Sequence, residues 1–341
     1  MRAPFAMALV LSFALPAVAQ TPGSGSRELL RLKHVWDRAA SPERARAEAV
    51  HAKVEELLRA AYEQHAEESG AGQEKISRAM QLLEDAHADQ SRDVRLRFDF
   101  GHVAEVRREE ERAAPVLESA LRDAPDHPMA LRAYFELGVC LAKLGRTEAE
   151  IVAYDEYLLR QTDPPNRALA LANRAEAYMT LGRQPHVTLG NLALAINDFR
   201  AALQIDPGYP QAHWGLAVAL DRYGDSPGAV AEAKLAVTYD PLETQISGPG
   251  VFFVPPYEQY WYEGLSATAR AQQLDDAPSS ILLWETAVAK WSAYVAVAAI
   301  DDRWLVLARA HLSWSQRQLE QAKKRASPPT RGRRARDDVD P

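Results

Sequence analysis

The residues best suited to chemistry in this 341-residue chain are a dense aromatic run and a few scattered polar groups. Aromatic residues make up 8% of the chain, yet they crowd into the segment FFVPPYEQYWYEG, residues 252–264. If its rings are exposed, this segment could stack on a sugar or a peptide. If they are buried, the same rings would fill a core. The six rings are Phe252, Phe253, Tyr257, Tyr260, Trp261 and Tyr262.

Recognisable catalytic patterns are missing from the sequence, which contains neither H-E-x-x-H nor G-x-S-x-G nor a phosphate-binding glycine loop. His102 and Glu105 stand one helical turn apart but have no third metal ligand near them, so we interpret them as a solvated or capping pair. Cys140 falls on an apolar helical stripe, where a buried structural thiol is expected. We therefore expect no enzymatic activity, no metal and no cofactor.

Composition favours a globular protein without a nucleic-acid partner. Apolar residues make up 47% of the chain and charged residues 26%, which is enough for a substantial core. The net charge of −7 gives no electrostatic case for a nucleic-acid partner, which would usually need a basic face. Beyond the N-terminus no apolar stretch is long enough to span a bilayer, so no membrane-spanning segment is expected after signal cleavage.

The first 20 residues, MRAPFAMALVLSFALPAVAQ, have the three-part layout of a cleavable export signal. Arg2 is followed by an apolar run over 6–15 and by the small-x-small triplet AVA at 17–19. A retained membrane anchor is the alternative, but the apolar run is short for that role. We expect cleavage before Gln20 and, because no cysteine follows, no lipid anchor. The mature chain should be periplasmic or secreted in a bacterium.

A repeat runs through the middle of the chain. Asp206-Pro207 recurs 34 residues later as Asp240-Pro241, and small residues recur with the same spacing or with short insertions. Repeats of this length are pairs of short helices, in which a small residue allows a close helix crossing and proline marks the end of the second helix. One pair cannot bury its apolar face alone, so neighbouring pairs stack into a solenoid.

Three segments in this region resemble the tetratricopeptide repeat family. They are AYFELGVCLAKLGRTEAEIVAYDEYL from Ala133, ANRAEAYMTLGR joined to ALAINDFRAALQIDP, and AHWGLAVALDRYGDSPGAVAEAKLAVTYDP. The first segment departs from the family pattern because Glu150 stands where a small residue is expected. The resemblance implies an all-α solenoid of stacked antiparallel helix pairs, with a helical N-terminal extension and a degenerate C-terminal helical section.

The predicted organisation follows from these patterns. Helix should resume near Tyr257 after the Gly- and Pro-rich interruption, with Gly264 at a helix crossing and Trp291 and Tyr294 on the partner helix. The predicted segments are a signal peptide at 1–19, a linker and helical extension at 20–92, a repeat solenoid at 93–241 (a weaker unit at 93–127 and three clear units in 131–241), a Gly/Pro/aromatic insertion at 242–258, degenerate C-terminal helices at 259–322 and a disordered charged tail at 323–341.

The resemblance also implies a binding groove, because the first helix of each pair lines the concave face that holds a peptide or a partner helix in this family. The alternative is that some of these residues pack against the C-terminal helices. A carboxylate-gripping arrangement is disfavoured, since Asn173 fits it but the flanking units do not. The groove residues expected from the register are Arg132, Phe135, Val139, Asn173, Glu176, Trp214, Val218 and Asp221.

We therefore expect an exported, non-enzymatic scaffold or adaptor that binds protein partners, in an assembly of a bacterial cell envelope. The alternative is an envelope glycan- or peptide-binding module that uses the aromatic cluster at 252–262. We favour a structural role for that cluster, with Phe252 and Phe253 filling the solenoid where regular stacking is broken. The rings available for an aromatic platform are Phe252, Phe253, Tyr257, Tyr260 and Trp261.

Overall fold

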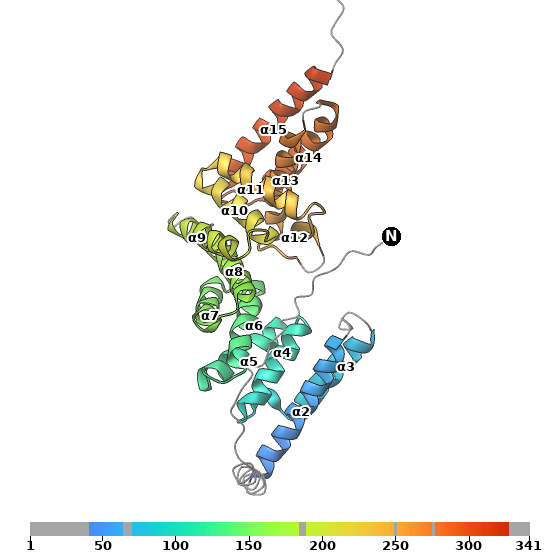
Figure 1. Cartoon of the computed structure of the whole chain (residues 1–341), viewed down its shortest axis with the longest axis vertical. Helices are drawn as coiled ribbons and strands as arrows, with labels where there is room; N and C mark the ends of the chain where they lie inside the picture. The colour runs from blue at the N-terminus through green and yellow to red at the C-terminus, as the bar shows by residue number, and fades with distance from the viewer. Residues whose placement is uncertain (1–40, 64–69, 184–188, 249–250, 275–276, 327–341) are drawn as a thin grey trace, which may run out of the picture. The chain divides into compact units, whose positions relative to one another are not determined.

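The computed structural model describes residues 41–326, apart from 64–69, 184–188, 249–250 and 275–276. Throughout these described residues the regular structure is helical and no β-strand occurs (Figure 1). The chain divides into two compact units, the first ending at Tyr178 and the second beginning at Met179. The predicted all-α fold of stacked antiparallel helix pairs is confirmed, and each unit is described by itself below.

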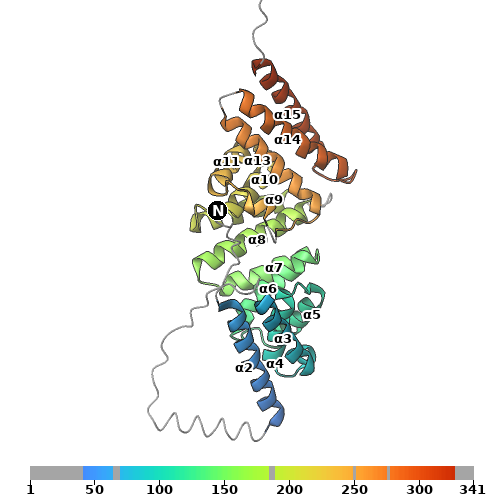
Figure 2. The same ribbon diagram turned by 90° about the vertical axis from the view of Figure 1, so that its right-hand side faces the viewer.

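Unit 1 consists of helix pairs that pack along their length, α2 with α3, α4 with α5, and α6 with α7. Figure 2 shows α4 and α5 beside α6 and α7 in this unit. α8 begins in unit 1 and ends in unit 2. The elements are α2 (Pro42–Tyr62), α3 (Gly70–Asp85), η2 (Ala88–Gln90), α4 (Val94–Val106), α5 (Glu110–Asp123), α6 (Ala130–Lys143), α7 (Thr147–Arg160) and α8 (Pro164–Gly182).

The close crossing within each pair comes from a small residue opposite a large one. At Gly138 of α6, a Cβ atom would lie 2.6 Å from the Tyr154 ring of α7. At Gly101 of α4, it would lie 2.3 Å from the Leu117 side chain of α5. Contacts this short would force the facing side chain to shift, so glycine allows these backbones to approach closely. The residue spacing of the repeat therefore encodes the pairing of the helices directly.

Unit 2 continues the pairing with α10 on α11 and α13 on α14, and α15 lies along α14 in both views (Figures 1 and 2). The Asp225 side chain caps the start of α11 by accepting from the Gly228 amide at 3.0 Å. The elements are α9 (Gly190–Ile205), α10 (Pro210–Tyr223), α11 (Ser226–Tyr239), α12 (Thr244–Ser247), η3 (Pro256–Glu258), α13 (Gln259–Gln273), α14 (Ala277–Val297) and α15 (Leu305–Ala326).

The aromatic segment at 252–264 spans the entry into α13. After an extended stretch, helical structure resumes at Pro256 as η3 and continues into α13, as expected near Tyr257. A Cβ atom at Gly264 would lie 2.7 Å from the ring of Trp291 on α14, which confirms the predicted helix crossing. The segment is therefore the start of a further helix pair that lacks a clear repeat signature.

The lengths and sequences of the described helices show whether any of them could span a membrane. Among residues 41–326 outside the gaps given above, no helix is both long enough and apolar enough to cross a bilayer. The predicted signal segment at 1–19 and the charged tail from 327 onward lie outside the described residues.

Candidate functional site

In unit 1, residues predicted to line the groove gather around one tyrosine of α7. The Phe135 ring lies 5.8 Å from that of Tyr154 and 5.2 Å from that of Tyr157, between ring centres. From α8, the Asn173 side-chain amide donates a 3.4 Å hydrogen bond to the Tyr154 hydroxyl. Tyr154 is 1% exposed, whereas Phe135 and Asn173 are half-buried at the edge of the packed interior.

The spacing on the two helices places a carboxylate pair beside this tyrosine. Glu150 and Tyr154 are four residues apart on α7 and therefore share a face, as Asn173 and Glu176 do on α8. The hydrogen bond between Asn173 and Tyr154 shows that these two helix faces lie against each other. Glu150 and Glu176 are close enough for the charge of Glu176 to act on the carboxyl group of Glu150. We call Phe135, Glu150, Tyr154, Asn173 and Glu176 the Tyr154 site.

Glu150 is the unusual member of this site. Its side chain is 5% exposed, and within the described part of the chain it makes no hydrogen bond or ion pair. Burial and the nearby charge of Glu176 raise the pKa of Glu150 to about 8. A carboxyl group with that pKa is largely protonated at neutral pH and can still become charged when a cation approaches.

A row of polar residues continues from this site onto α6 and α4. His102 Nδ1 lies 2.6 Å from Glu136 Oε1, and Arg132 Nε lies 3.3 Å from the same oxygen. His102 is 8% exposed and lies against Glu136 of α6, so the expectation of a solvated or capping pair with Glu105 was wrong. Burial and the charge of Glu136 raise the pKa of Glu105 to about 7. The guanidinium group of Arg132 already pairs with Glu136 within the chain.

The remaining groove candidate in unit 1 is Val139, which lies half-buried on α6, one turn after Phe135. Next to it, Cys140 is completely buried, as predicted for a structural thiol. Burial, followed by the charge of Glu105, raises the pKa of the Cys140 thiol above its usual range. A thiol held in its protonated form at neutral pH is unreactive.

In unit 2 the groove prediction was wrong. Trp214 is 1% exposed, Val218 is 0% and Asp221 is 1%, so these side chains are part of the core. Asp221 Oδ2 accepts a 3.0 Å hydrogen bond from Trp261 Nε1 of α13 and lies 2.8 Å from His311 Nε2 of α15. The later helices α13 and α15 cover the face of α10 that the register alone would leave open.

The aromatic run does not form a platform. Trp261 is completely buried, and its ring meets those of Trp291 and Tyr294 edge-on at 5.2 Å and 5.1 Å between centres. Tyr257 and Tyr260 are half-buried. The filling role expected of the two phenylalanines is also partly wrong, because Phe253 packs on Tyr262 at 5.0 Å whereas Phe252 is 47% exposed.

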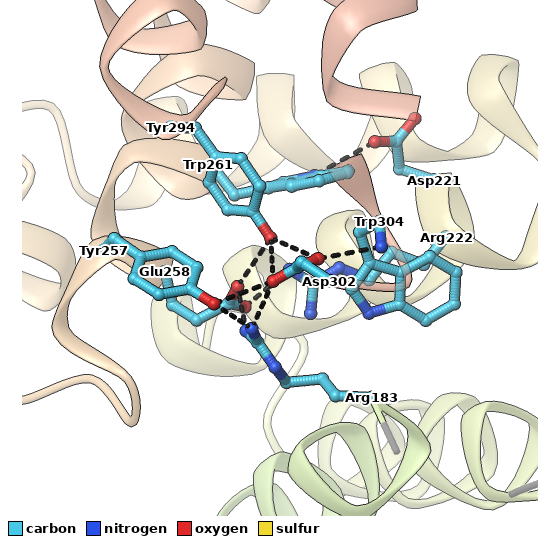
Figure 3. Close-up of polar contacts among 9 residues, drawn as sticks. All are labelled: Arg183, Asp221, Arg222, Tyr257, Glu258, Trp261, Tyr294, Asp302 and Trp304. Atoms are coloured by element: carbon cyan, nitrogen blue, oxygen red, sulfur yellow. Dashed lines mark hydrogen bonds and ion pairs between the residues drawn. The ribbon is translucent and has the colours of Figure 1, made fainter. Parts of the chain in front are cut away.

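The aromatic run contributes Tyr257 and Glu258 to a buried cluster of charged residues, shown in Figure 3. Glu258 pairs through its two oxygens with Arg183 and with Arg222, the latter at 2.5 Å. Arg183 also lies 2.6 Å from Asp302 Oδ2, which accepts a 2.8 Å hydrogen bond from the Tyr257 hydroxyl. The Tyr294 hydroxyl donates to Glu258 at 3.1 Å. We call Arg183, Arg222, Tyr257, Glu258, Tyr294 and Asp302 the Glu258 cluster.

The Glu258 cluster is electrically balanced, with two arginines facing two carboxylates. Burial alone would lower the pKa of Arg183, but the charges of Glu258 and Asp302 raise it above its usual range. The side chains of Arg222 and Asp302 are each 1% exposed. A largely buried, balanced cluster of this kind orients the helices that carry it and offers little to a ligand.

Sequence reasoning missed the Glu258 cluster and only flagged Glu150. Arg183 and Asp302 are 119 residues apart, and a single glutamate within an aromatic run forms no motif that would join them. Glu150 did carry a signal, because it replaces the small residue of the repeat pattern. Within the described residues, no group of three or more His, Cys, Asp and Glu side chains could hold a metal ion.

Comparison with known proteins decides the family. Models described as "Tetratricopeptide repeat" match residues 98–166 and residues 187–247. The chain is a tetratricopeptide-repeat protein. Repeats of this family present extended surfaces for other proteins, so the chain is a protein-interaction scaffold of a generally non-enzymatic family.

A curated relative matches over a short stretch. The tetratricopeptide repeat and J domain-containing co-chaperone DNJ1 of Fusarium oxysporum f. sp. lycopersici is 37% identical over 92 residues. The match covers 27% of this chain and 16% of that protein. The tetratricopeptide-repeat chain described here therefore spans only a small part of its relative.

Solved structures give more distant likenesses. MamA AMB-1 has a TM-score of 0.46 and 20% identity, covering 57% of this chain and 99% of that one. MamA 41-end from Desulfovibrio magneticus RS-1 has a TM-score of 0.43 and 17% identity, covering 56% and 97%. YrrB, titled a TPR protein with an unusual peptide-binding site, has a TM-score of 0.43 and 19% identity, covering 50% and 81%.

Proposed function

We propose that this protein is an exported scaffold that binds a protein partner through the Tyr154 site, within an assembly of a bacterial cell envelope. The observation that carries the proposal is that Phe135 and Asn173, both predicted from the repeat register to face a partner, contact Tyr154, while Glu176, predicted in the same way, lies near Glu150. In unit 2 the equivalent face of α10 is covered by α13 and α15, so unit 1 offers the better surface.

The chemistry of the Tyr154 site suits an extended peptide. The half-buried Phe135 ring offers apolar contact to a side chain, and the side-chain amide of Asn173 can exchange hydrogen bonds with a peptide backbone. The carboxyl groups of Glu150 and Glu176 lie beside them, and that of Glu150 is largely protonated at neutral pH. An apolar ring, an amide and carboxylates within one small area can fix both the position and the direction of a bound segment.

The test of this binding site is co-purification with matched variants. The mature chain, tagged and incubated with a solubilised envelope fraction, should enrich a partner that Phe135→Ala loses by about tenfold or more. The control is Leu159→Ala, which removes an apolar side chain from α7 at a position that is 78% exposed and outside the site. Equal recovery of the partner by wild type and Phe135→Ala would reject the Tyr154 site as the interface.

Export is tested separately, because it rests on the N-terminal sequence. Expressed in a Gram-negative host, the protein should be found in the periplasmic fraction, with a mass that corresponds to an N-terminus at Gln20. Replacing residues in the apolar run at 6–15 by charged ones should retain the precursor in the cytoplasm. An intact N-terminus on protein from the cytoplasmic fraction would contradict export.

A further inference from the structure

Resting on the proposed function, we infer that Glu150 binds the partner as a neutral carboxylic acid, donating a hydrogen bond to a backbone carbonyl oxygen of the bound peptide segment. The inference starts from a departure from the family pattern, because Glu150 replaces a small residue of the repeat. The chain places there a carboxyl group that is 5% exposed and makes no hydrogen bond or ion pair within the described residues.

Other buried acids in this protein lie against cations, and Glu150 does not. Burial would raise the pKa of Glu136, but the charges of His102 and Arg132 lower it. Glu258 lies between two arginines. Without a cation in contact, the buried carboxyl group of Glu150 keeps its proton at neutral pH, and a protonated carboxyl group is a hydrogen-bond donor.

The helices packed around Glu150 supply one charge that acts on it. Burial, followed by the charge of Glu176 on α8, raises the pKa of Glu150 to about 8. Burial also keeps the Cys140 thiol of α6 and the Tyr154 hydroxyl of α7 protonated, since it raises the pKa of each above its usual range. Other charged groups on these helices form ion pairs, namely Arg132 with Glu136, Lys143 with Glu110, Arg146 with Glu118 and Arg174 with Asp155.

A bound segment can reach this donor. The oxygens of Glu150 do not belong to the described side-chain atoms that are both unpaired and sealed from solvent. Glu150 lies one helical turn before Tyr154 on α7, and the half-buried side chains of Phe135 and Asn173 contact that tyrosine. A peptide held by Phe135 and Asn173 would therefore pass beside the carboxyl group.

The group that accepts from Glu150 should carry no charge. The negative charge of Glu176 disfavours an anionic acceptor. A lysine or arginine would bind only after Glu150 had lost its proton, so its affinity would rise with pH. An extended peptide presents a carbonyl oxygen at every residue, and a buried donor is costly while it has no partner. A backbone carbonyl therefore satisfies the donor whatever the side chains of the segment are.

The test measures binding affinity as a function of pH. The mature full-length chain is screened on an array of degenerate, N-terminally acetylated dodecapeptides free of histidine and cysteine. Calorimetry with the tightest-binding peptide then gives the affinity from pH 7 to pH 9, and thermal melts at each pH show that the chain stays folded. An acid that must be protonated to bind, with a pKa of about 8, predicts an affinity about tenfold lower at pH 9 than at pH 7.

Matched variants assign this pH dependence to one group. Glu150→Gln keeps a donor that does not titrate, so its affinity should stay within about twofold of the wild-type value at pH 7 across the whole range. Glu150→Leu keeps the size but has no donor, so it should bind about three- to tenfold more weakly at pH 7. The control Glu148→Gln, at an exposed position of the same helix, should keep the wild-type fall in affinity.

The outcomes separate this inference from the function on which it rests. Wild-type affinity that is independent of pH, or that rises with pH as a basic side chain would require, overturns the inference and leaves the scaffold proposal intact. A fall in affinity that Glu150→Gln shares with wild type also overturns it, because another group then titrates. Failure of wild type to bind any peptide at any pH overturns both the inference and the Tyr154 site as a peptide-binding surface.

Discussion

Glu150 in unit 1 and Glu258 in unit 2 are both buried glutamates in stacked helix pairs, yet their surroundings are opposite. Glu258 is 6% exposed and sits between Arg183 and Arg222, with a tyrosine hydroxyl completing its contacts. Glu150 is 5% exposed and faces another carboxylate, that of Glu176. The two side chains are exposed to nearly the same extent, so they differ in their interaction partners and not in their burial.

The difference separates a buried charge with a structural role from a buried carboxyl group to which we assign a role in partner binding. A buried charge that is fully paired fixes the arrangement of the elements that carry it, and removing one partner is costly. A buried acid without a partner lowers the stability of the free protein, and an interaction outside the chain can restore that loss. On this comparison the Glu258 cluster is part of the scaffold, and the Tyr154 site is the surface that we propose for a partner.

The largest change in the free energy of unfolding is expected for Glu258→Gln, and this variant tests the structural role of the Glu258 cluster. The variant leaves Arg222, which is fully buried, without its counter-charge, so the free energy of unfolding should fall by about 3–5 kcal/mol. Urea unfolding followed by circular dichroism measures it. Glu285→Gln, which removes an exposed partner of Lys323, should change the same quantity by less than about 1 kcal/mol. A small effect of Glu258→Gln would remove the Glu258 cluster from the structural side of the comparison.

In contrast to Glu258→Gln, the variant Glu150→Gln is expected to increase the free energy of unfolding. In the folded state the pKa of Glu150 is raised to about 8 from an ordinary value of 4.5, so the folded chain holds this proton more tightly than the unfolded chain does. Stability from this group is therefore complete below pH 4.5 and is lost as the pH rises to about 8. At pH 9 the glutamine variant should be more stable than wild type, on the order of 3 kcal/mol.

Unfolding free energies of both proteins, measured from pH 5 to pH 9, check this sign. The difference between variant and wild type should grow with pH and level off above about pH 8. A variant that is less stable than wild type across the whole range would show that Glu150 has a stabilising partner after all.

The glycine crossings extend the comparison from charge to packing, and here the two units should behave alike. Gly138→Ala pushes a methyl group to within 2.6 Å of the Tyr154 ring, and Gly264→Ala to within 2.7 Å of Trp291. Each should cost about 1–3 kcal/mol through overpacking, measured by urea unfolding. Gly182→Ala, whose new atom meets neighbours at 3.7 Å, is the tolerated control. A cost confined to one unit would show that the crossings are not equivalent.

The smallest effect is expected for Tyr257→Phe, which sharpens the description of the Glu258 cluster. The variant keeps the ring but loses the hydroxyl that accepts from Arg183 and donates to Asp302, both at 2.8 Å. A loss of about 1–2 kcal/mol in the free energy of unfolding is expected. Tyr239→Phe, on an exposed tyrosine stacked on His213, should be neutral. Equal behaviour of the two variants would place Tyr257 outside the Glu258 cluster.

The helix pairs could be predicted because their contacts are local and periodic. Gly264 and Trp291 follow the small-and-large pairing of a repeat, so their crossing is visible in the sequence even where the repeat signature has faded. The groove in unit 2 could not be predicted in the same way. The residue that covers Asp221 is His311, 90 positions later, on a helix without the repeat pattern.

The candidate site in unit 1 could be predicted only in part. The register predicted that Phe135 and Asn173 line a groove, and in the fold both lie against Tyr154, because equivalent positions of successive repeats face the same way. The register assigned no role to Glu150. A glutamate in place of a small residue can be exposed, can have an internal partner or can be an unpaired acid, and the sequence does not distinguish these three situations. Deciding among these outcomes requires the burial and the contacts that the fold imposes.

The measurement that tests the central claim most directly is the proton balance of binding. Calorimetry of wild type with the peptide selected from the array, at pH 9 and in two buffers of different ionisation enthalpy, should show uptake of about one proton, because binding returns Glu150 to its neutral form. Glu150→Gln should bind the same peptide without proton uptake. Equal heats in both buffers for wild type would contradict the claim that Glu150 binds the partner as a neutral acid.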